Sequence, residues 1–474
     1  MLFSLLPLKL PTSFPVRSLP LLIILVLLTG LYYPSQAQRK VQQKVPERTR
    51  ILFLLDGSGS MNGIWQNGES RMDVAKRILA RLVDSLRTND NLELALRVYG
   101  HRYARQSNNC QDTKLEVPFG TRNHDKIIQK LTEIVPKGVT PITYSLLQAA
   151  TDFPPNQGYR NILILITDGV ESCDGDPCAT SIELQRRGVF LRPFIIGLGL
   201  AGGRALDCAG KYFDSNNSTT FNNVLNEAIQ TTFSTTSVSV ELLDANGNPD
   251  ETNVNVSFLN EMTGTAAYEF VHYLDANGRP DSVNIDPVLN YTVVVNTVPQ
   301  VIRKNVNIIN GQHNVVAIPV PQGNLVVRQE GRRAGFPVVV RRKGGMEIVN
   351  TQMANENFRY LQGDYTLETL TLPRRHFEVT VDADKTRTIS LPAPGLVNIN
   401  TLSHGYGSLF EIMADGTEEW VCHLETKKSQ HAYTLLPGKY KVAFRVQDSG
   451  GSKYTGIKVF QLSPGQTLNI GVFD

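Results

Sequence analysis

The stretch ILFLLDGSGS, residues 51–60, decides the fold. It opens with five consecutive apolar residues and breaks at Asp56, after which glycine and serine alternate. A short continuous apolar run of this kind predicts a strand buried on both faces of a parallel sheet. The stretch ILILITDG, residues 162–169, repeats the pattern, with Asp168 after the apolar run. We therefore expect two buried strands that each end in a polar loop.

Helical patterns separate these strands. Between the two runs and after them, apolar residues recur at the spacing of one helix face. The expected helices lie at 74–86, 125–135, 141–153, 180–187 and 222–233, and further strands at 92–99 and 189–197. Strands that alternate with helices over residues 49–234 predict a doubly wound α/β domain with a mostly parallel sheet and helices on both faces.

From residue 235 onward the pattern changes to strands and turns. Tyr291, Tyr365 and Tyr440 each open a strand-like segment, and they are spaced by 74 and 75 residues. A period of this length indicates one unit copied in tandem, so the three tyrosines are expected on equivalent strands. We predict three β-sandwich modules, at 236–321, 322–393 and 394–474, the first with an insertion.

A near-verbatim repeat lies within the first predicted module. The sequence LDANGNPD at 243–250 recurs as LDANGRPD at 274–281. Its alternating acidic and amide residues are compatible with a Ca²⁺ loop. The second copy, however, has Arg279 where a ligand would be needed, and Asn-Gly is a common hairpin signal. Turns are the favoured interpretation.

The loops after the two buried strands carry hard oxygen ligands. Ligand sites in open α/β sheets form at the carboxyl ends of strands, which is where Asp56 and Asp168 fall. Ser58 and Ser60 follow at alternate positions, and Thr140 adds a hydroxyl from a third loop. Two carboxylates and three hydroxyls suit one divalent cation, Mg²⁺ before Mn²⁺ or Ca²⁺, with room left for an outside oxygen. The set includes no His or Cys, which argues against a soft metal.

This constellation resembles the metal-ion-dependent adhesion site of von Willebrand factor type A domains. Asp56, Ser58 and Ser60 match the family's Asp-x-Ser-x-Ser element, Thr140 its threonine and Asp168 its distal aspartate. The resemblance implies that the hydroxyls contact the cation directly, with the aspartates often acting through water. The segments YGHR (99–102), Cys110 with Asp112, and DGVESC (168–173) resemble a subgroup of exported bacterial members. His101 and Arg102 either line the rim of the site or have packing roles.

The N-terminal segment has the features of an export signal. Residues 1–37 combine the basic Lys9 and Arg17, an apolar core at 19–33 and the small residues of Ser35-Gln36-Ala37. The alternative is an uncleaved membrane anchor, for which the core is short. We predict a cleaved signal peptide at 1–37, a linker at 38–48, and a secreted, periplasmic or cell-surface protein without membrane insertion after cleavage.

The five cysteines and the charge balance fit an exported protein. Disulfides persist outside the cytoplasm. Cys173 and Cys178 are close enough in a turn-rich stretch to close a small loop, while the pairing of the other three cysteines stays open and at least one is unpaired. Without residues 1–37 the chain has 45 basic and 44 acidic residues, which gives no electrostatic case for nucleic acid.

Three functions remain for such a chain. The first is a non-enzymatic binding or adhesion protein whose cation engages an acidic group of a protein partner. The second is an accessory subunit of an envelope transport or secretion complex, and the third is a metal-dependent enzyme. The enzyme hypothesis has the least support, because the predicted site offers hydroxyls but neither a general base nor a positioned nucleophile, which catalysis would need. No catalytic residue is predicted, and the oligomeric state stays open.

Overall fold

The computed structural model describes residues 45–155, 158–199, 205–331 and 335–473. The predicted signal peptide at 1–37 and the linker residues before 45 lie outside these ranges. Within them, no helix is long and apolar enough to cross a membrane.

The first part of the described chain is built around a six-stranded sheet. Its strand order is β5 (Thr113–Gly120), β4 (Leu92–Tyr99), β1 (Arg48–Asp56), β6 (Tyr159–Thr167), β7 (Phe194–Leu198) and β8 (Lys211–Ser215). Every neighbouring pair is parallel except β4 and β5. The two quoted apolar runs are the adjacent strands β1 and β6, with Ile51 opposite Ile162. Because parallel strands end at one edge of the sheet, Asp56 and Asp168 are brought to the same edge.

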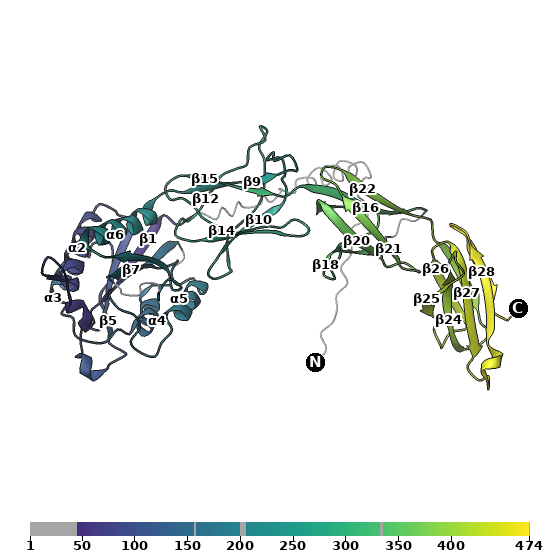
Figure 1. Ribbon diagram of the computed structural model, residues 1–474, viewed down its shortest axis with the longest axis horizontal. Coiled ribbons are helices and arrows are strands. Elements are labelled where there is room, and N and C mark those ends of the chain that lie inside the picture. The colour runs from purple at the N-terminus through teal and green to yellow at the C-terminus, as the bar shows by residue number, and fades with distance from the viewer. Residues whose placement is uncertain (1–44, 156–157, 200–204, 332–334, 474) are drawn as a thin grey trace, which may run out of the picture. The chain divides into compact units, whose positions relative to one another are not determined.

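Five helices cover both faces of this sheet (Figure 1). They are α2 (Arg71–Ser85), α3 (His124–Glu133), α4 (Ile142–Asp152), α5 (Pro177–Arg186) and α6 (Ser218–Phe233). Alternate residues of β1 point to opposite faces: Ile51 and Phe53 pack in a cluster with α2, α3 and α6, whereas Leu52 packs with α4 and α5. The predicted doubly wound α/β architecture is confirmed. Smaller elements near the sheet are a hairpin, β2 (Ile64–Gln66) with β3 (Glu69–Ser70), and the 3₁₀ turns Gly59–Asn62 and Arg105–Ser107.

Two edge strands were not expected from the sequence, and one expected strand is shorter. β5 carries Pro118 and the charged Lys114 and Glu116, a pattern that does not indicate a buried strand. β8 is only five residues long and half-buried. The strand expected at 189–197 begins only at Phe194, because the preceding residues turn around the end of α5.

The remainder of the described chain forms three β-sandwiches with one strand order. In each sandwich a four-stranded sheet faces a three-stranded sheet, and the first and last strands of the module are neighbours in the smaller sheet. The three modules in Figure 1 therefore share a topology.

Module 1 pairs β11 (Ala266–Val271), β10 (Asn255–Asn260), β13 (Tyr291–Val295) and β14 (Val301–Val306) with β12 (Val283–Asn284), β9 (Ser237–Leu243) and β15 (His313–Pro319). Module 2 pairs β18 (Ile348–Met353), β17 (Pro337–Arg342), β20 (Gly363–Thr369) and β21 (Arg375–Val381) with β19 (Asn357–Leu361), β16 (Gln322–Gln329) and β22 (Thr386–Leu391). Module 3 pairs β25 (Glu418–His423), β24 (Gly405–Ile412), β27 (Gly438–Val446) and β28 (Gly456–Leu462) with β26 (Gln430–Leu435), β23 (Gly395–Asn400) and β29 (Thr467–Gly471). A 3₁₀ turn, Ser452–Tyr454, precedes β28.

The repeated tyrosines occupy the same place in each module, as the sequence period predicts. Tyr291, Tyr365 and Tyr440 lie on the third strand of the four-stranded sheet, and each side chain is fully buried. Each hydroxyl donates to a backbone carbonyl a few residues upstream, on Asp286, Leu361 and Leu436 respectively, at 2.6–2.7 Å. The buried ring fills the core while its hydroxyl fixes the preceding turn.

The two LDANG segments form turns, as expected. Asp244 Oδ1 accepts from the backbone N–H groups of Asn246 and Asn248, and Asp275 Oδ1 accepts in the same way from Asn277 and Arg279. These bonds to the ionised carboxylate lower the pKa of Asp244 and of Asp275. The carboxylates are thus engaged by their own turns.

Candidate metal site

Asp56 is the buried centre of a hydrogen-bonded cluster at the carboxyl edge of the sheet. It is the last residue of β1 and has no exposed surface. Its Oδ1 accepts from the Ser58 backbone N–H at 2.7 Å, and its Oδ2 accepts from the Thr167 hydroxyl at 2.7 Å. Burial, followed by repulsion from Asp168, raises the pKa of Asp56 to about 6. The protein alone therefore holds this carboxylate in surroundings that disfavour its charge.

The two serines connect Asp56 to Asp168. The hydroxyl oxygens of Ser58 and Ser60 lie 3.0 Å apart, and the Ser60 hydroxyl donates to Asp168 Oδ1 at 2.7 Å. Ser58 is buried and Ser60 is exposed, so the chain of contacts runs from the interior to the surface. The structure thus brings these four predicted residues together.

Thr140 reaches the same place from the third loop. A Cβ built on Gly169 would lie 3.5 Å from the Thr140 hydroxyl oxygen, which places Thr140 beside the residue that follows Asp168. The Thr140 backbone is bonded to Ser172 in both directions: its N–H donates to the Ser172 hydroxyl at 2.7 Å and its carbonyl accepts from the Ser172 N–H at 3.1 Å. All five predicted residues lie at one edge of the sheet, and their role as ligands stays a prediction.

Close packing of three loops fixes this edge. Gly59 N–H donates to the Gly138 carbonyl at 2.9 Å, which joins the serine loop to the loop of Thr140. Gly100 has a φ of +67°, and a Cβ there would lie 2.4 Å from the Val139 carbonyl oxygen. Only glycine fits such a position without displacing the backbone. The loops are therefore held by backbone contacts as well as by the polar side chains.

Asp168 has one carboxylate oxygen that lacks a hydrogen-bond partner. Its side chain is 1% exposed, and Oδ2 is buried without a hydrogen bond. The guanidinium of Arg71 lies 3.4 Å from this oxygen, close enough for an ion pair but without hydrogen-bond geometry. Burial raises the pKa of Asp168, while the Ser60 hydroxyl and Arg71 oppose that shift. An unpaired buried carboxylate oxygen is costly unless a positive group satisfies it.

Several residues around the site were not singled out from the sequence. Thr167 fixes the Asp56 carboxylate, and Arg71 is anchored by a bond from its Nε to the Leu198 carbonyl at 3.1 Å. Glu171 accepts from the backbone N–H groups of Thr143 and Cys173, at 2.6 and 2.9 Å. Thr167 and Glu171 are close to Asp168 along the chain, and this proximity could have indicated that they belong to the site. Nothing in the sequence indicates the same for Arg71.

His101 and Arg102 are held by partners of their own. His101 Nε2 lies 2.9 Å from Glu116 Oε1, and Arg102 Nε donates to Asp112 Oδ1 at 2.9 Å. Asp112 is buried, and it also accepts from the Arg102 backbone N–H at 3.0 Å. Of the two interpretations of His101 and Arg102, these contacts favour the packing role.

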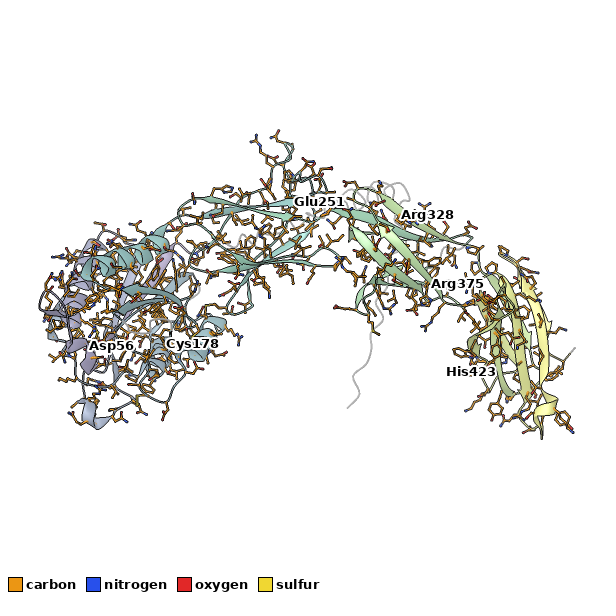
Figure 2. The ribbon with its side chains drawn as sticks, viewed as in Figure 1. Asp56, Cys178, Glu251, Arg328, Arg375 and His423 are labelled. Atoms are coloured by element: carbon orange, nitrogen blue, oxygen red, sulfur yellow. A yellow bond between two sulfur atoms is a disulfide. The ribbon has the colours of Figure 1, made fainter. Side chains whose placement is uncertain are left out.

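The expectation of a disulfide between Cys173 and Cys178 is wrong. The structure instead pairs Cys110 with Cys173 and Cys178 with Cys208, at Cα separations of 5.8 and 5.3 Å. Asp176 caps α5 by accepting from the Cys178 and Ala179 N–H groups, which fixes Cys178 within the first helical turn. Asp56 and Cys178 are both labelled in Figure 2, within the part of the chain that carries the helices. Cys422 is free, in accordance with the expectation of an unpaired cysteine.

A cation at this edge would depend on hydroxyl ligands. Among the described residues no group of three or more His, Cys, Asp and Glu side chains is arranged to hold a metal. The two carboxylates and three hydroxyls are all hard oxygens, which fits Mg²⁺ with waters completing its shell. Burial and repulsion between Asp56 and Asp168 disfavour two charged carboxylates at this edge, and Asp168 Oδ2 has only the ion pair with Arg71 to offset its charge.

Comparisons with known proteins agree with this architecture. The family model of the von Willebrand factor type A domain matches residues 51–235. The Bacillus subtilis (strain 168) proteins YwmD and YwmC, both described as uncharacterized, are 32% identical over 182 residues and 28% identical over 171 residues. The alignments cover 37% and 35% of this chain, and 77% and 74% of the two relatives.

Solved structures to which the chain shows similarity include BatB from Bacteroides thetaiotaomicron and the pilus adhesin SpaC from Lactobacillus rhamnosus GG in its open conformation. BatB is 21% identical, with 38% of this chain and 99% of BatB covered and a TM-score of 0.31. SpaC is 12% identical, with 89% of this chain and 66% of SpaC covered and a TM-score of 0.34. From the family model and the B. subtilis relatives, the chain belongs to the von Willebrand factor type A domain family.

Proposed function

We propose that this protein is an exported, non-enzymatic binding protein that uses one divalent cation, Mg²⁺ in the first place, to engage a carboxylate of a protein partner. The residues that would hold the cation are Asp56, Ser58, Ser60, Thr140 and Asp168. The observation that carries the proposal is the pair of buried carboxylates joined through two serines. Ser58 donates its backbone N–H to Asp56, its hydroxyl lies beside that of Ser60, and the Ser60 hydroxyl donates to Asp168.

The donor set supports a site that is completed from outside. The Asp56 carboxylate accepts hydrogen bonds from the Ser58 backbone N–H and from the Thr167 hydroxyl, while Ser60 is exposed at the outer end of the cluster. When bound, the cation supplies an electrophilic position for a carboxylate oxygen of the partner. The task of the chain is to hold its own oxygens in place beforehand, which the loop contacts of Gly59 and Thr140 accomplish.

Binding is a better use of this arrangement than catalysis. A general base must lie within reach of the reacting group. The histidine of the neighbouring loop, His101, is engaged by Glu116, and Glu171 is engaged by two backbone N–H groups. Asp56 is itself buried under the serines. These groups are tied to structural partners, which supports a site that holds a cation and presents it.

Export is supported by the N-terminal sequence and by the two disulfides. Both bridges lie in the domain that carries the site, and Cys110–Cys173 joins the loop of Asp168 to the loop before β5. Disulfides persist in oxidising compartments. A secreted, periplasmic or surface-exposed protein is thus the proposed setting.

The test is the replacement Asp56→Ala in the full chain, with thermal unfolding followed in Mg²⁺ and in EDTA. Mg²⁺ at about 100 times its Kd should stabilise the wild-type domain by about 2.7 kcal/mol, because the cation binds only the folded state. For a domain of this size that is an increase in Tm of roughly 5–10 °C. The variant should remain folded, because Asp56 lies at the end of β1 rather than within its apolar run, and should show no increase.

The matched control is Asp90→Ala, which removes an exposed carboxylate just before β4, at the opposite edge of the sheet. It should respond to Mg²⁺ as the wild type does. Partner capture from envelope extract, with elution by EDTA, tests the second half of the proposal. Equal responses to Mg²⁺ in Asp56→Ala and wild type would contradict the metal site. A capture that survives EDTA would separate partner binding from the cation.

A further inference from the structure

The first and last strands of every β module are hydrogen-bonded to each other in parallel. In module 1, β9 and β15 pair over seven residues, from Ser237 opposite His313 to Leu243 opposite Pro319. In module 2, β16 and β22 pair over six residues, and in module 3, β23 and β29 pair over five. We call each of these sets of bonds the terminal-strand ladder of its module.

Parallel pairing decides how a pull on the module reaches the ladder. The chain enters a module at the start of its first strand and leaves at the end of its last strand. In a parallel pair these two points lie at opposite ends of the ladder. Tension between them therefore acts along the strands and loads all the ladder bonds at once. In an antiparallel pair the two points would lie at the same end, and the bonds would open one after another.

The ladders of modules 1 and 3 are reinforced by side-chain hydrogen bonds. In module 1, both ring nitrogens of His313 on β15 reach serine hydroxyls of β9, Ser237 at 2.9 Å and Ser239 at 3.0 Å. In module 3, Asn398 on β23 donates to Asn469 Oδ1 on β29 at 2.7 Å. These side-chain bonds cross the same two strands that the backbone ladder joins, so they resist the same sliding.

The inner side of each first strand is also closed to water. Val238, Val240 and Leu242 of β9 have at most 1% of their surface exposed, and Val397 and Ile399 of β23 are equally buried. Sliding the ladder by one residue would move these side chains out of the core, because adjacent residues of a strand point to opposite faces. Apolar packing and hydrogen bonds therefore oppose the same displacement.

The ladders follow one another closely along the chain. Only Val320 and Pro321 separate β15 from β16, and only residues 392–394 separate β22 from β23. Proline fixes the φ angle of both connections and leaves little slack. We propose that the three β modules are a force-bearing tether, in which the parallel terminal-strand ladders carry tension between the von Willebrand factor type A domain and the residues that follow Gly471.

The test is single-molecule force spectroscopy of the full chain, held by tags at its two ends. Both proteins that are pulled carry Cys422→Ser, so that the free native thiol does not compete for attachment. Three high-force events are expected, one for each module. Each should release on the order of 25 nm of chain, because an extended residue spans about 3.5 Å.

The matched control pulls module 3 from a second direction without changing its contacts. Leu402→Cys places a handle on an exposed residue just after β23, and the other handle stays at the C-terminus. Both handles then lie at the same end of the ladder between β23 and β29, so its bonds open one by one. Forced unfolding depends on the barrier along the direction of pulling rather than on equilibrium stability. The unfolding force of module 3 should be several-fold lower than in the end-to-end experiment.

If module 3 unfolds at the same force when it is pulled from residue 402 as when the chain is pulled end to end, the proposal is overturned. A side-chain variant adds a second test. His313→Ala should lower the unfolding force of module 1 alone, whereas His376→Ala, on a strand outside the ladders, should leave all three forces unchanged. Neither result depends on Mg²⁺, so the tether and the cation site can fail separately.

Discussion

Arg71 provides a positive charge at the candidate metal site. It is the first residue of α2, and its guanidinium reaches Asp168 Oδ2 at 3.4 Å while its Nε is bonded to the Leu198 carbonyl. Asp168 is almost fully buried, so this ion pair offsets part of the cost of a charged carboxylate in the interior. A divalent cation bound by Asp168 would supply the same compensation. Arg71 should therefore matter most when the cation is absent.

The stability of Arg71→Met should therefore depend on Mg²⁺. In EDTA the variant should be less stable than the wild type by about 1–3 kcal/mol, the cost of leaving a buried charged group without its partner. In saturating Mg²⁺ the difference should shrink, because the cation takes over the compensation of Asp168. Thermal unfolding in the two buffers measures both values. Arg81→Met, an exposed arginine on the same helix, is the control and should change little in either buffer.

A loss of stability that is the same with and without Mg²⁺ would show that Arg71 acts only through packing.

The sequence could not identify Arg71 as part of the site. Asp56 and Asp168 were predictable because each directly follows an apolar strand, and parallel strands end together. Arg71 approaches Asp168 only through the turn of the chain between β1 and α2, and an arginine at the start of a helix is typical of a solvated surface. The disulfide partners were hidden for a similar reason, because Cys110 and Cys173 are 63 residues apart in sequence.

At the scale of elements, the buried tyrosines are the best-predicted feature of the β modules. The 74- and 75-residue spacing located equivalent strands, and the structure adds a shared hydrogen bond that the spacing alone could not reveal. Strands β5 and β8 were not predicted because they lie at the edges of the sheet. Edge strands bury one side or only a few residues, so they lack the continuous apolar run of a central strand. The helices and the buried strands of the α/β domain were recognisable because each buries a continuous apolar surface.

The shared bond predicts a common effect of removing the hydroxyl. Tyr365→Phe keeps the buried ring and leaves the Leu361 carbonyl without its donor, so module 2 should lose about 0.5–1.5 kcal/mol. Tyr291→Phe and Tyr440→Phe should have similar effects in their own modules. Denaturant unfolding of each variant measures the loss. Phe358→Leu, a partly exposed position in module 2, is a comparison in which no hydroxyl is lost. An unchanged stability in all three tyrosine variants would show that the bond does not fix the turn.

At the scale of the whole molecule, the described chain has several separate buried clusters. Two flank the six-stranded sheet, and one lies between the sheets of each β module. The candidate metal site touches only the first domain. Calorimetry of the full chain should therefore show that Mg²⁺ raises the transition of the α/β domain by roughly 5–10 °C and leaves the module transitions in place. A uniform shift of every transition would mean that all parts unfold as one unit.

The order of the disulfides along the chain has a consequence for biosynthesis. Cys110 pairs with Cys173, and Cys178 pairs with Cys208, so the first cysteine joins the second and the third joins the fourth. A polypeptide that is oxidised as it emerges meets its thiols in this order, and each new second thiol finds a single unpaired predecessor. Native bridges then form without the slow reshuffling that corrects mispaired ones. Refolding from the fully reduced state exposes all five thiols together, and there the neighbouring Cys173 and Cys178 compete. Emergence of the chain, N-terminus first, into an oxidising compartment would therefore favour the native pairing, and Cys422 would emerge only after the other four cysteines.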